Sequence, residues 1–317
     1  MTANRHPLRG YIYIATAAFL WGIGANLGRA AFIGKLARFG SFDAITPVIL
    51  SQTRTTFSFL IIFPVLLMNR GWLQLRLPRA DFLRLLTLGV LGVAASNYFY
   101  YLAIQRTNVA IAIIVQYTAP VWVLFYMVVR GLQKLSWQRI ASVMFAVGGT
   151  TLLVGIGAGK LNLDKIGLIA ALLAAFSFSF YNIGAHNLLV RYDHWIVLLY
   201  TTFSAALFWI VFNPPWRVVA AHYSPVQWLY MLVFSIISVL GPFSFYFAGL
   251  RHLEPTRAII VSCLEPVFSI LIAAMVLAET MKSLQILGMV LVLFAIVAIQ
   301  IPSRIQREPS LQVEPIE

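Results

Sequence analysis

The chain has 317 residues, of which 61% are hydrophobic and 10% are charged, and its mean hydropathy is +0.86. Soluble domains carry about 25% charged residues, so this composition excludes an ordinary soluble protein and predicts an all-α, polytopic membrane protein embedded in a lipid bilayer. The net charge of +13 does not indicate nucleic-acid binding, because the basic residues are scattered over short loops. The single cysteine, Cys263, lies in an apolar stretch and forms no disulfide or metal motif. No metal and no cofactor is expected.

About ten apolar stretches are long enough to cross a bilayer. The first, 11–28, follows a short basic lead and is expected to be retained rather than cleaved as a signal peptide. A polar segment with three prolines, 302–317, is expected to be a disordered cytoplasmic tail. After the second span we expect a basic turn that holds Arg70, Arg76, Arg79 and Arg84. Spans two to ten are expected at about 45–68, 83–104, 109–129, 138–157, 166–190, 194–212, 226–249, 256–277 and 284–301.

The distribution of lysine and arginine predicts the orientation. Ten spans put both termini on one side of the membrane, and that side carries 14 Lys and Arg residues against 8 on the other, with Arg54 inside a span. Cytoplasmic loops are enriched in positive charge. We therefore expect a multi-pass protein of the cell (inner or plasma) membrane with both termini in the cytoplasm.

The two halves of the chain repeat each other. A shift of 146 residues places TTFS at 55–58 on TTFS at 201–204, and AIIV at 112–115 on AIIV at 258–261. The first spans match with a shift of 157, because the first half has 11 additional residues after its first span. Five spans per repeat is an odd number, so the second copy must enter the membrane upside down. This is the inverted-repeat design of secondary transporters, which hold substrate near the midplane; the alternative is a duplication kept for folding alone.

A carboxylate and a proline stand side by side inside the ninth span. A charge at this depth costs a few kcal/mol, and Pro266 removes one helical hydrogen bond, so the span is expected to line a polar cavity rather than face lipid. Pro120 occupies the matching place in the first half, whereas Ala119 stands where the second half has Glu265. We expect the kink in both halves and the charge in one.

Several motifs carry a family resemblance. They are Leu20-Trp21-Gly22, Arg54, LEPV at 264–267, Ala278-Glu279 and QILG at 285–288, with a degenerate first-half version that has Gln133 and Ser142. On these motifs the chain resembles the drug/metabolite transporter superfamily, in its ten-helix EamA-type branch. The resemblance implies two five-helix repeats, 11–157 and 166–301, and a carrier that exports amino acids or related metabolites. The branch is broad in substrate, so the substrate's identity stays open.

Polar and aromatic side chains within the spans are the candidate substrate-binding residues. Buried amides need partners, so they are expected to face the protein interior, where they contact substrate or join helices. Asn97 and Tyr101 share a helix face, and Tyr98 is turned away. The candidate set is Trp21, Asn97, Tyr101, Gln116, Tyr181, Asn182, Tyr246, Ser262 and Glu265.

Two charged residues have specific candidate roles. Glu265 is the candidate for proton coupling or for contact with a substrate ammonium group; the alternative is a carboxylate that stabilises the broken helix. Arg54 is the candidate for recognition of a substrate carboxylate, for which its planar guanidinium is well suited; the alternative is a structural ion pair or snorkelling. Glu279 is expected to be structural.

The leading hypothesis is a secondary carrier that works by alternating access and exports a small amphiphilic metabolite, as a monomer or homodimer. Direction of transport and coupling to protons stay open. The alternatives are a multidrug antiporter, although the first span lacks an acidic residue, and a nucleotide-sugar carrier, although interior lysines are scarce. An enzyme is not expected, because none of the five histidines is spaced with acids or cysteine as a metal or nucleophile site requires.

Overall fold

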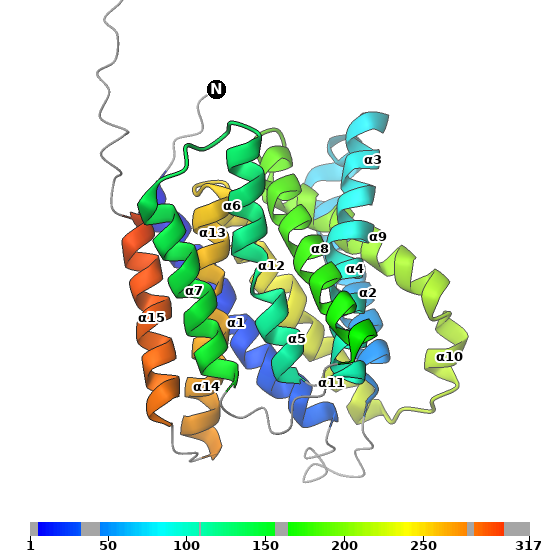
Figure 1. Ribbon diagram of the computed structural model, residues 1–317. Coiled ribbons are helices and arrows are strands. Elements are labelled where there is room, and N and C mark those ends of the chain that lie inside the picture. The colour runs from blue at the N-terminus through cyan, green and yellow to red at the C-terminus, as the bar shows by residue number, and fades with distance from the viewer. Residues whose placement is uncertain (1–5, 33–44, 108, 156–163, 278–281, 301–317) are drawn as a thin grey trace, which may run out of the picture.

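The computed structural model describes residues 6–32, 45–107, 109–155, 164–277 and 282–300, and the secondary-structure elements among them are helices, with no β-strand. Nine of the described helices or helix chains have the length and hydropathy of a membrane span. The fifth expected span corresponds to α7 (Trp137–Gly155), which is not among these nine and runs alongside α15 (Ser283–Gln300) (Figure 1). The prediction of an all-α, polytopic membrane protein is confirmed. Glu279 and the expected tail, 302–317, lie outside the described residues.

Several expected spans are chains of shorter helices. The third span joins α3 (Arg79–Thr87), the π-helical segment η2 (Leu88–Ala94) and α4 (Ala95–Arg106), and the eighth joins α11 (Pro225–Ser235), η3 (Ile236–Leu240) and α12 (Gly241–Leu250). The remaining elements are α1 (Pro7–Phe32), α2 (Pro47–Leu75), α5 (Val109–Gln116), α6 (Ala119–Val129), α8 (Lys165–Leu189), α9 (His194–Phe212), the short α10 (Pro215–Val219), α13 (Pro255–Ser262) and α14 (Leu264–Leu277).

The expected basic turn after the second span is wrong for most of its residues. Arg70 lies within α2, which extends to Leu75, and Arg79 and Arg84 lie in α3. The chain changes direction inside α2 at Gly71, whose φ of 74° favours glycine because a Cβ would be strained there. The second span was expected to end at about residue 68, whereas the helix bends at Gly71 and continues to Leu75.

The two spans that contain the matched prolines are both interrupted. α5 ends at Gln116 and α13 ends at Ser262, 146 residues apart, and the prolines fall in the first turns of α6 and α14. Proline is tolerated there because the first residues of a helix have no intrahelical partner for their N–H groups. The π-helical segments end at Ala94 and Leu240, also 146 residues apart. The structural irregularities therefore follow the shift that aligns the two sequences.

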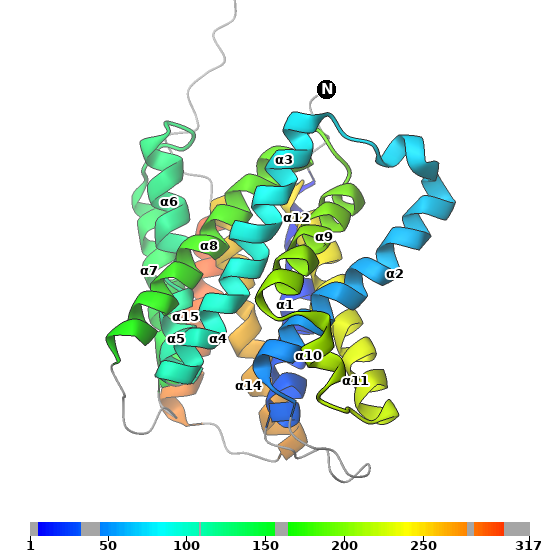
Figure 2. The same cartoon turned by 90° about the vertical axis from the view of Figure 1, so that its right-hand side faces the viewer.

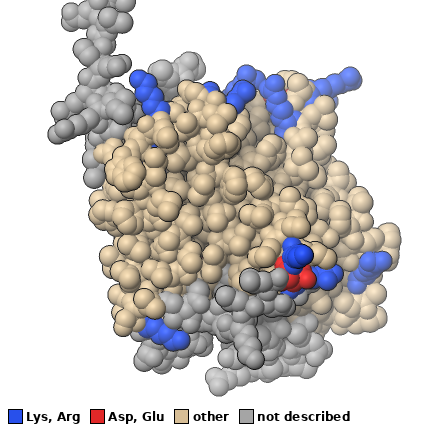
Figure 3. Space-filling view, in the orientation of Figure 1, with Lys and Arg blue, Asp and Glu red and all other residues tan. Residues whose placement is uncertain are grey.

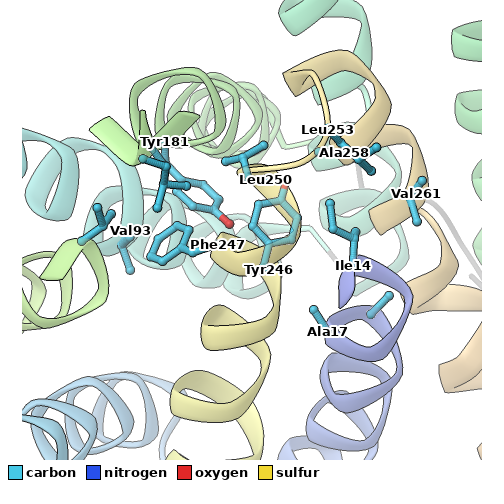
Figure 4. Packing of buried hydrophobic residues seen from close by; sticks show 14 of the residues in the cluster. Ile14, Ala17, Val93, Tyr181, Tyr246, Phe247, Leu250, Leu253, Ala258 and Val261 are labelled. Carbon is cyan, nitrogen blue, oxygen red and sulfur yellow. The ribbon is translucent and has the colours of Figure 1, made fainter. Parts of the chain in front are cut away.

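Helices from the two halves pack across each other. α1 packs against α12, α13 and α14, whereas α8 packs against α4, η2 and α5; α2 lies along α9 (Figures 1 and 2). Small residues allow these close approaches: a Cβ on Gly24 of α1 would lie 3.1 Å from Cβ of Ser238, as expected for a small-residue packing face. Figure 4 shows Ile14 of α1 beside Tyr246 of α12 in the buried core.

Charged side chains gather at the two ends of the bundle. On the face shown in Figure 3, lysine and arginine lie along the end that holds the first residue of α1, with a smaller group near the opposite end. The wide zone between them shows uncharged side chains, as a surface in contact with lipid requires. The first residue of α1 and the last residue of α15 lie at the same end (Figure 1).

Candidate functional site

A carboxylate and a phenol connect the two interrupted helices. Glu265 lies at the start of α14, deep in the bundle, and its side chain keeps partial solvent access. Its Oε2 atom accepts a hydrogen bond of 2.6 Å from the hydroxyl of Tyr117, which follows the last residue of α5. Each half thus contributes one member of the pair. A buried carboxylate needs such a donor, because an unpaired charge in the interior is costly.

A guanidinium from α2 is held by α4, within electrostatic reach of Glu265. Arg54 donates from Nη2 to Oδ1 of Asn97, and its charged carbon lies 6.0 Å from the centroid of the Tyr101 ring. Asn97 is oriented by its own bond of 2.7 Å from Nδ2 to the carbonyl of Val93, one turn earlier. Asn97 and Tyr101 therefore share a face, as predicted, whereas Tyr98 packs on Phe212.

The charges of Arg54 and Glu265 interact electrostatically. No ion pair within 4.0 Å joins their side chains in the described part of the chain. Both side chains keep partial access to solvent. We call the five residues of this region, Arg54, Asn97, Tyr101, Tyr117 and Glu265, the central polar zone. It presents a positive and a negative group that are not neutralised by direct contact with each other.

A second group of candidates forms an aromatic cluster between α8, α12 and α1. Asn182 donates from Nδ2 to the hydroxyl of Tyr246, and Figure 4 shows the Tyr181 hydroxyl directed towards Tyr246. These three side chains are fully buried. Trp21 of α1 covers one edge, with its ring 5.3 Å from that of Tyr246, and is half-buried. In this conformation the cluster joins helices, and Trp21 is its accessible member.

The remaining two candidates lie where the interrupted helices end. Ser262 is buried and donates to the carbonyl of Ile259 at 2.7 Å, within its own helix. Gln116 is half-buried at the end of α5, and its side chain makes no hydrogen bond to any described residue. The side-chain amide of Gln116 is therefore available to a ligand, whereas the hydroxyl of Ser262 is already bonded within its own helix.

Two contacts in this region were not expected from sequence. Tyr117 is the direct partner of Glu265, although it was not among the candidate residues, and only its position beside the interruption could have indicated it. Asn26 of α1 donates to the carbonyls of Gly22, at 2.9 Å, and Ser269, at 3.0 Å. Its spacing of four residues from Gly22 is the signal that was available. Asn26 fixes α1 against α14 next to Glu265.

Polar contacts around Asp193, the N-cap of α9, connect α2 to helix ends of the second half, at the end of the bundle that holds the first residue of α1. Asp193 contacts Arg70 at 2.5 Å, His194 at 2.8 Å and Arg251 at 3.3 Å. Burial alone would raise the pKa of Asp193, but the hydrogen bond from Arg70 and the nearby positive charges outweigh it and lower that pKa. Gln133, which replaces the glutamate of the motif, donates to Glu254 at 2.9 Å and accepts from Thr256. These contacts hold loops of the two halves together.

The described residues contain no group of three or more His, Cys, Asp or Glu side chains that could hold a metal ion. The central polar zone brings groups of opposite charge together beside a helix interruption inside the bundle. Irregular backbone at membrane depth is tolerated where it is buried in protein or lines a polar space.

Comparisons with known proteins agree with this geometry. The model of the EamA-like transporter family matches residues 8–155 and 165–301. The uncharacterized inner membrane transporter YicL of Salmonella typhimurium is 24% identical over 93% of this chain and 96% of its own length. The threonine/homoserine exporter RhtA of the same species is 26% identical over 75% of this chain and 77% of its own. A crystal structure that is 20% identical shares the fold, with a TM-score of 0.75 over 96% of this chain and 100% of that one. The chain therefore belongs to the EamA-like transporter family.

Proposed function

We propose that this transporter is a secondary carrier that exports amino acids or related small zwitterionic metabolites. The observation that carries the proposal is that Arg54 and Glu265, two residues of opposite charge, both belong to the central polar zone and interact electrostatically without forming a direct ion pair. An α-amino acid has a carboxylate that suits the guanidinium fork and an ammonium that suits the carboxylate. The name of the related exporter RhtA supports the same substrate class.

The roles within the site follow from the contacts. Arg54, held by Asn97 and by the Tyr101 ring, receives the substrate carboxylate. Glu265, held by Tyr117, receives the ammonium group. Gln116 and Trp21, both half-buried, provide an amide and an apolar wall for the substrate side chain. Glu265 is also the group that would couple transport to protons.

The transport cycle is proposed as an exchange between two inverted five-helix repeats, 11–157 and 166–301. The crosswise packing of α1 and α8 on the opposite halves supports this, because neither repeat is a separate body. The loop contacts around Asp193 would open when the site faces their side. We propose that both termini, and hence this end, are cytoplasmic.

A metabolite screen tests the proposal. Cells that overexpress the protein should accumulate specific amino acids in the medium, measured by mass spectrometry, and tolerate toxic analogues of the same amino acids. The matched control is the Glu265→Gln variant at equal expression, which should show neither effect. Accumulation of a nucleotide sugar, or resistance to lipophilic cations with no change in amino acids, would replace this proposal with one of the two alternative carriers.

A further inference from the structure

A cavity on the outer surface of the bundle lies apart from the central polar zone. It has a volume of about 290 Å³ and opens between α3 and the end of α8. α8 closely approaches η2, which continues α3: a Cβ on Gly184 would lie 2.7 Å from Cδ1 of Leu88. Both of these residues line the cavity, together with Thr87 of α3 and Asn187 of α8.

Two arginines form the rim of this cavity. Arg84 and Arg191 have 60% and 63% of their side chains exposed, and both approach Oδ1 of Asp81, at 2.9 and 3.8 Å. Asp81 also accepts a hydrogen bond of 2.5 Å from Tyr192. Two positive charges thus share one carboxylate, which leaves a surplus of one positive charge. Each guanidinium has five N–H donors, so donors remain for an anion.

The inner part of the cavity is apolar. Leu88 and Phe180 line it, and Phe180 has 44% of its surface exposed. Leu83 and Val190, which directly precede the two arginines in the chain, are also exposed. The charged rim lies at the end of a membrane span, and the apolar surface beside it is exposed. These two parts match the charged headgroup and the acyl chains of a lipid at the headgroup boundary.

We propose that this cavity binds an anionic phospholipid with a single phosphodiester charge, such as phosphatidylglycerol. The phosphate lies between Arg84 and Arg191 and neutralises the surplus charge, and an acyl chain runs along Phe180. The exposed amide of Asn187 donates to the headgroup or glycerol oxygens. The site is independent of the transported substrate, because it opens on the outer face of the bundle rather than on Glu265.

Native mass spectrometry of the purified, delipidated full-length protein tests this. With equal amounts of phosphatidylglycerol and phosphatidylcholine, the wild type should retain phosphatidylglycerol preferentially, and the double variant Arg84→Gln/Arg191→Gln should retain at least about five-fold less. The control Arg130→Gln removes an exposed arginine at the end of α6 and should bind as the wild type does. Inorganic phosphate in excess should not displace the lipid.

A second variant covers the case in which loss of the arginines disturbs the fold by freeing Asp81. Asn187→Trp fills the cavity from an exposed position and leaves the Asp81 contacts in place. It should also reduce retention of phosphatidylglycerol, with an unchanged elution profile and circular dichroism spectrum. Equal retention by the wild type and Asn187→Trp, or displacement of the lipid by inorganic phosphate, would overturn the proposal.

Discussion

The two interrupted helices of this transporter share one construction and differ in chemistry. α5 and α13 end at positions 146 residues apart, and a proline follows each interruption within the first turn of the next helix. The residue immediately before that proline is Ala119 in the first half and Glu265 in the second. The two halves therefore share the interruption and the proline that follows it, and they differ in the residue directly before that proline.

The helices that cross these interruptions also pack alike in both halves but meet different side chains. α1 passes the start of α14 so closely that a Cβ on Gly22 would lie 3.2 Å from the carbonyl oxygen of Glu265. α8 passes the start of α6, where Ser179 donates to the carbonyl of Ala119 at 3.2 Å. Gly22 and Ser179 correspond under the shift of 157 residues that aligns the first spans of the halves. The crossing is common to both halves, and only one crossing has a charge beside it.

The largest effect is expected from Glu265→Gln. It keeps the shape of the side chain but removes the charge that Tyr117 holds and that Arg54 attracts. The variant weakens two charge-assisted hydrogen bonds, one from Tyr117 and one from the proposed substrate ammonium, and each contributes about 1.5–3 kcal/mol. Transport should therefore fall by about 100-fold or more. The measurement is the initial rate of amino-acid efflux from reconstituted vesicles. Glu265→Asp, which keeps the charge, should retain more activity; equal rates for Gln and Asp would contradict a role for the charge.

Arg54→Lys is expected to have the next largest effect. Lysine keeps the positive charge but loses the planar fork that contacts both Asn97 and Tyr101. A charge-assisted hydrogen bond contributes about 1.5–3 kcal/mol, so transport should fall about ten-fold or more, mainly through a higher KM. An unchanged KM for Arg54→Lys would show that the guanidinium does not contact the substrate.

Tyr117→Phe tests the contact that crosses between the halves. It removes the hydroxyl that donates to Glu265 at 2.6 Å and should reduce transport about five-fold, because a typical hydrogen bond contributes about 1 kcal/mol. The corresponding residue of the second half is Cys263, which is buried. Cys263→Ala should change transport by less than about two-fold. Similar losses for the two variants would mean that Tyr117 acts by packing alone.

The shared construction itself is tested by Pro120→Ala and Pro266→Ala. Because both prolines lie in the first turn of a helix, each substitution should change stability by about 1 kcal/mol or less, and the two should be similar. The check is the thermal unfolding midpoint of the detergent-solubilised variants. A loss of stability confined to one proline would show that the interruptions are not equivalent.

The smallest effect is expected at the end of the bundle, far from both interruptions. The folded-state pKa of Asp193 is lowered, so its contacts with Arg70 and Arg251 stabilise the fold above its ordinary pKa of about 4, and this contribution disappears as the pH falls below that value. The midpoint of unfolding should therefore decrease between about pH 4 and pH 3 more for the wild type than for Asp193→Asn. Parallel curves would assign the acid sensitivity to other carboxylates.

Sequence patterns predicted the helices well where periodicity and length decide the structure. The seventh span was expected at 194–212, and α9 covers His194–Phe212. The extension of α2 was missed because the bend depends on a single positive φ at Gly71. The π-helical segments η2 and η3 were missed because a change of backbone hydrogen-bond register leaves the hydrophobic pattern almost unaltered.

The candidate site was predictable in composition but not in pairing. Glu265 and Arg54 could be singled out because charges inside a membrane span are costly. Their partners Tyr117 and Asn97 lie 148 and 43 residues away in the chain, so only the folded arrangement identifies them. Sequence also could not separate the accessible Gln116 from the buried Ser262, although the two occupy matching positions in the repeats.

The most direct test of the central claim is amino-acid efflux from vesicles that contain the protein. Vesicles loaded with an equimolar mixture of the twenty amino acids, with and without an imposed proton gradient, are sampled over time by mass spectrometry. A subset of amino acids should leave faster through the wild type than through Glu265→Gln or from protein-free vesicles. If every amino acid leaves the wild-type and Glu265→Gln vesicles at the same rate under both conditions, the protein does not export amino acids through a site that contains Glu265.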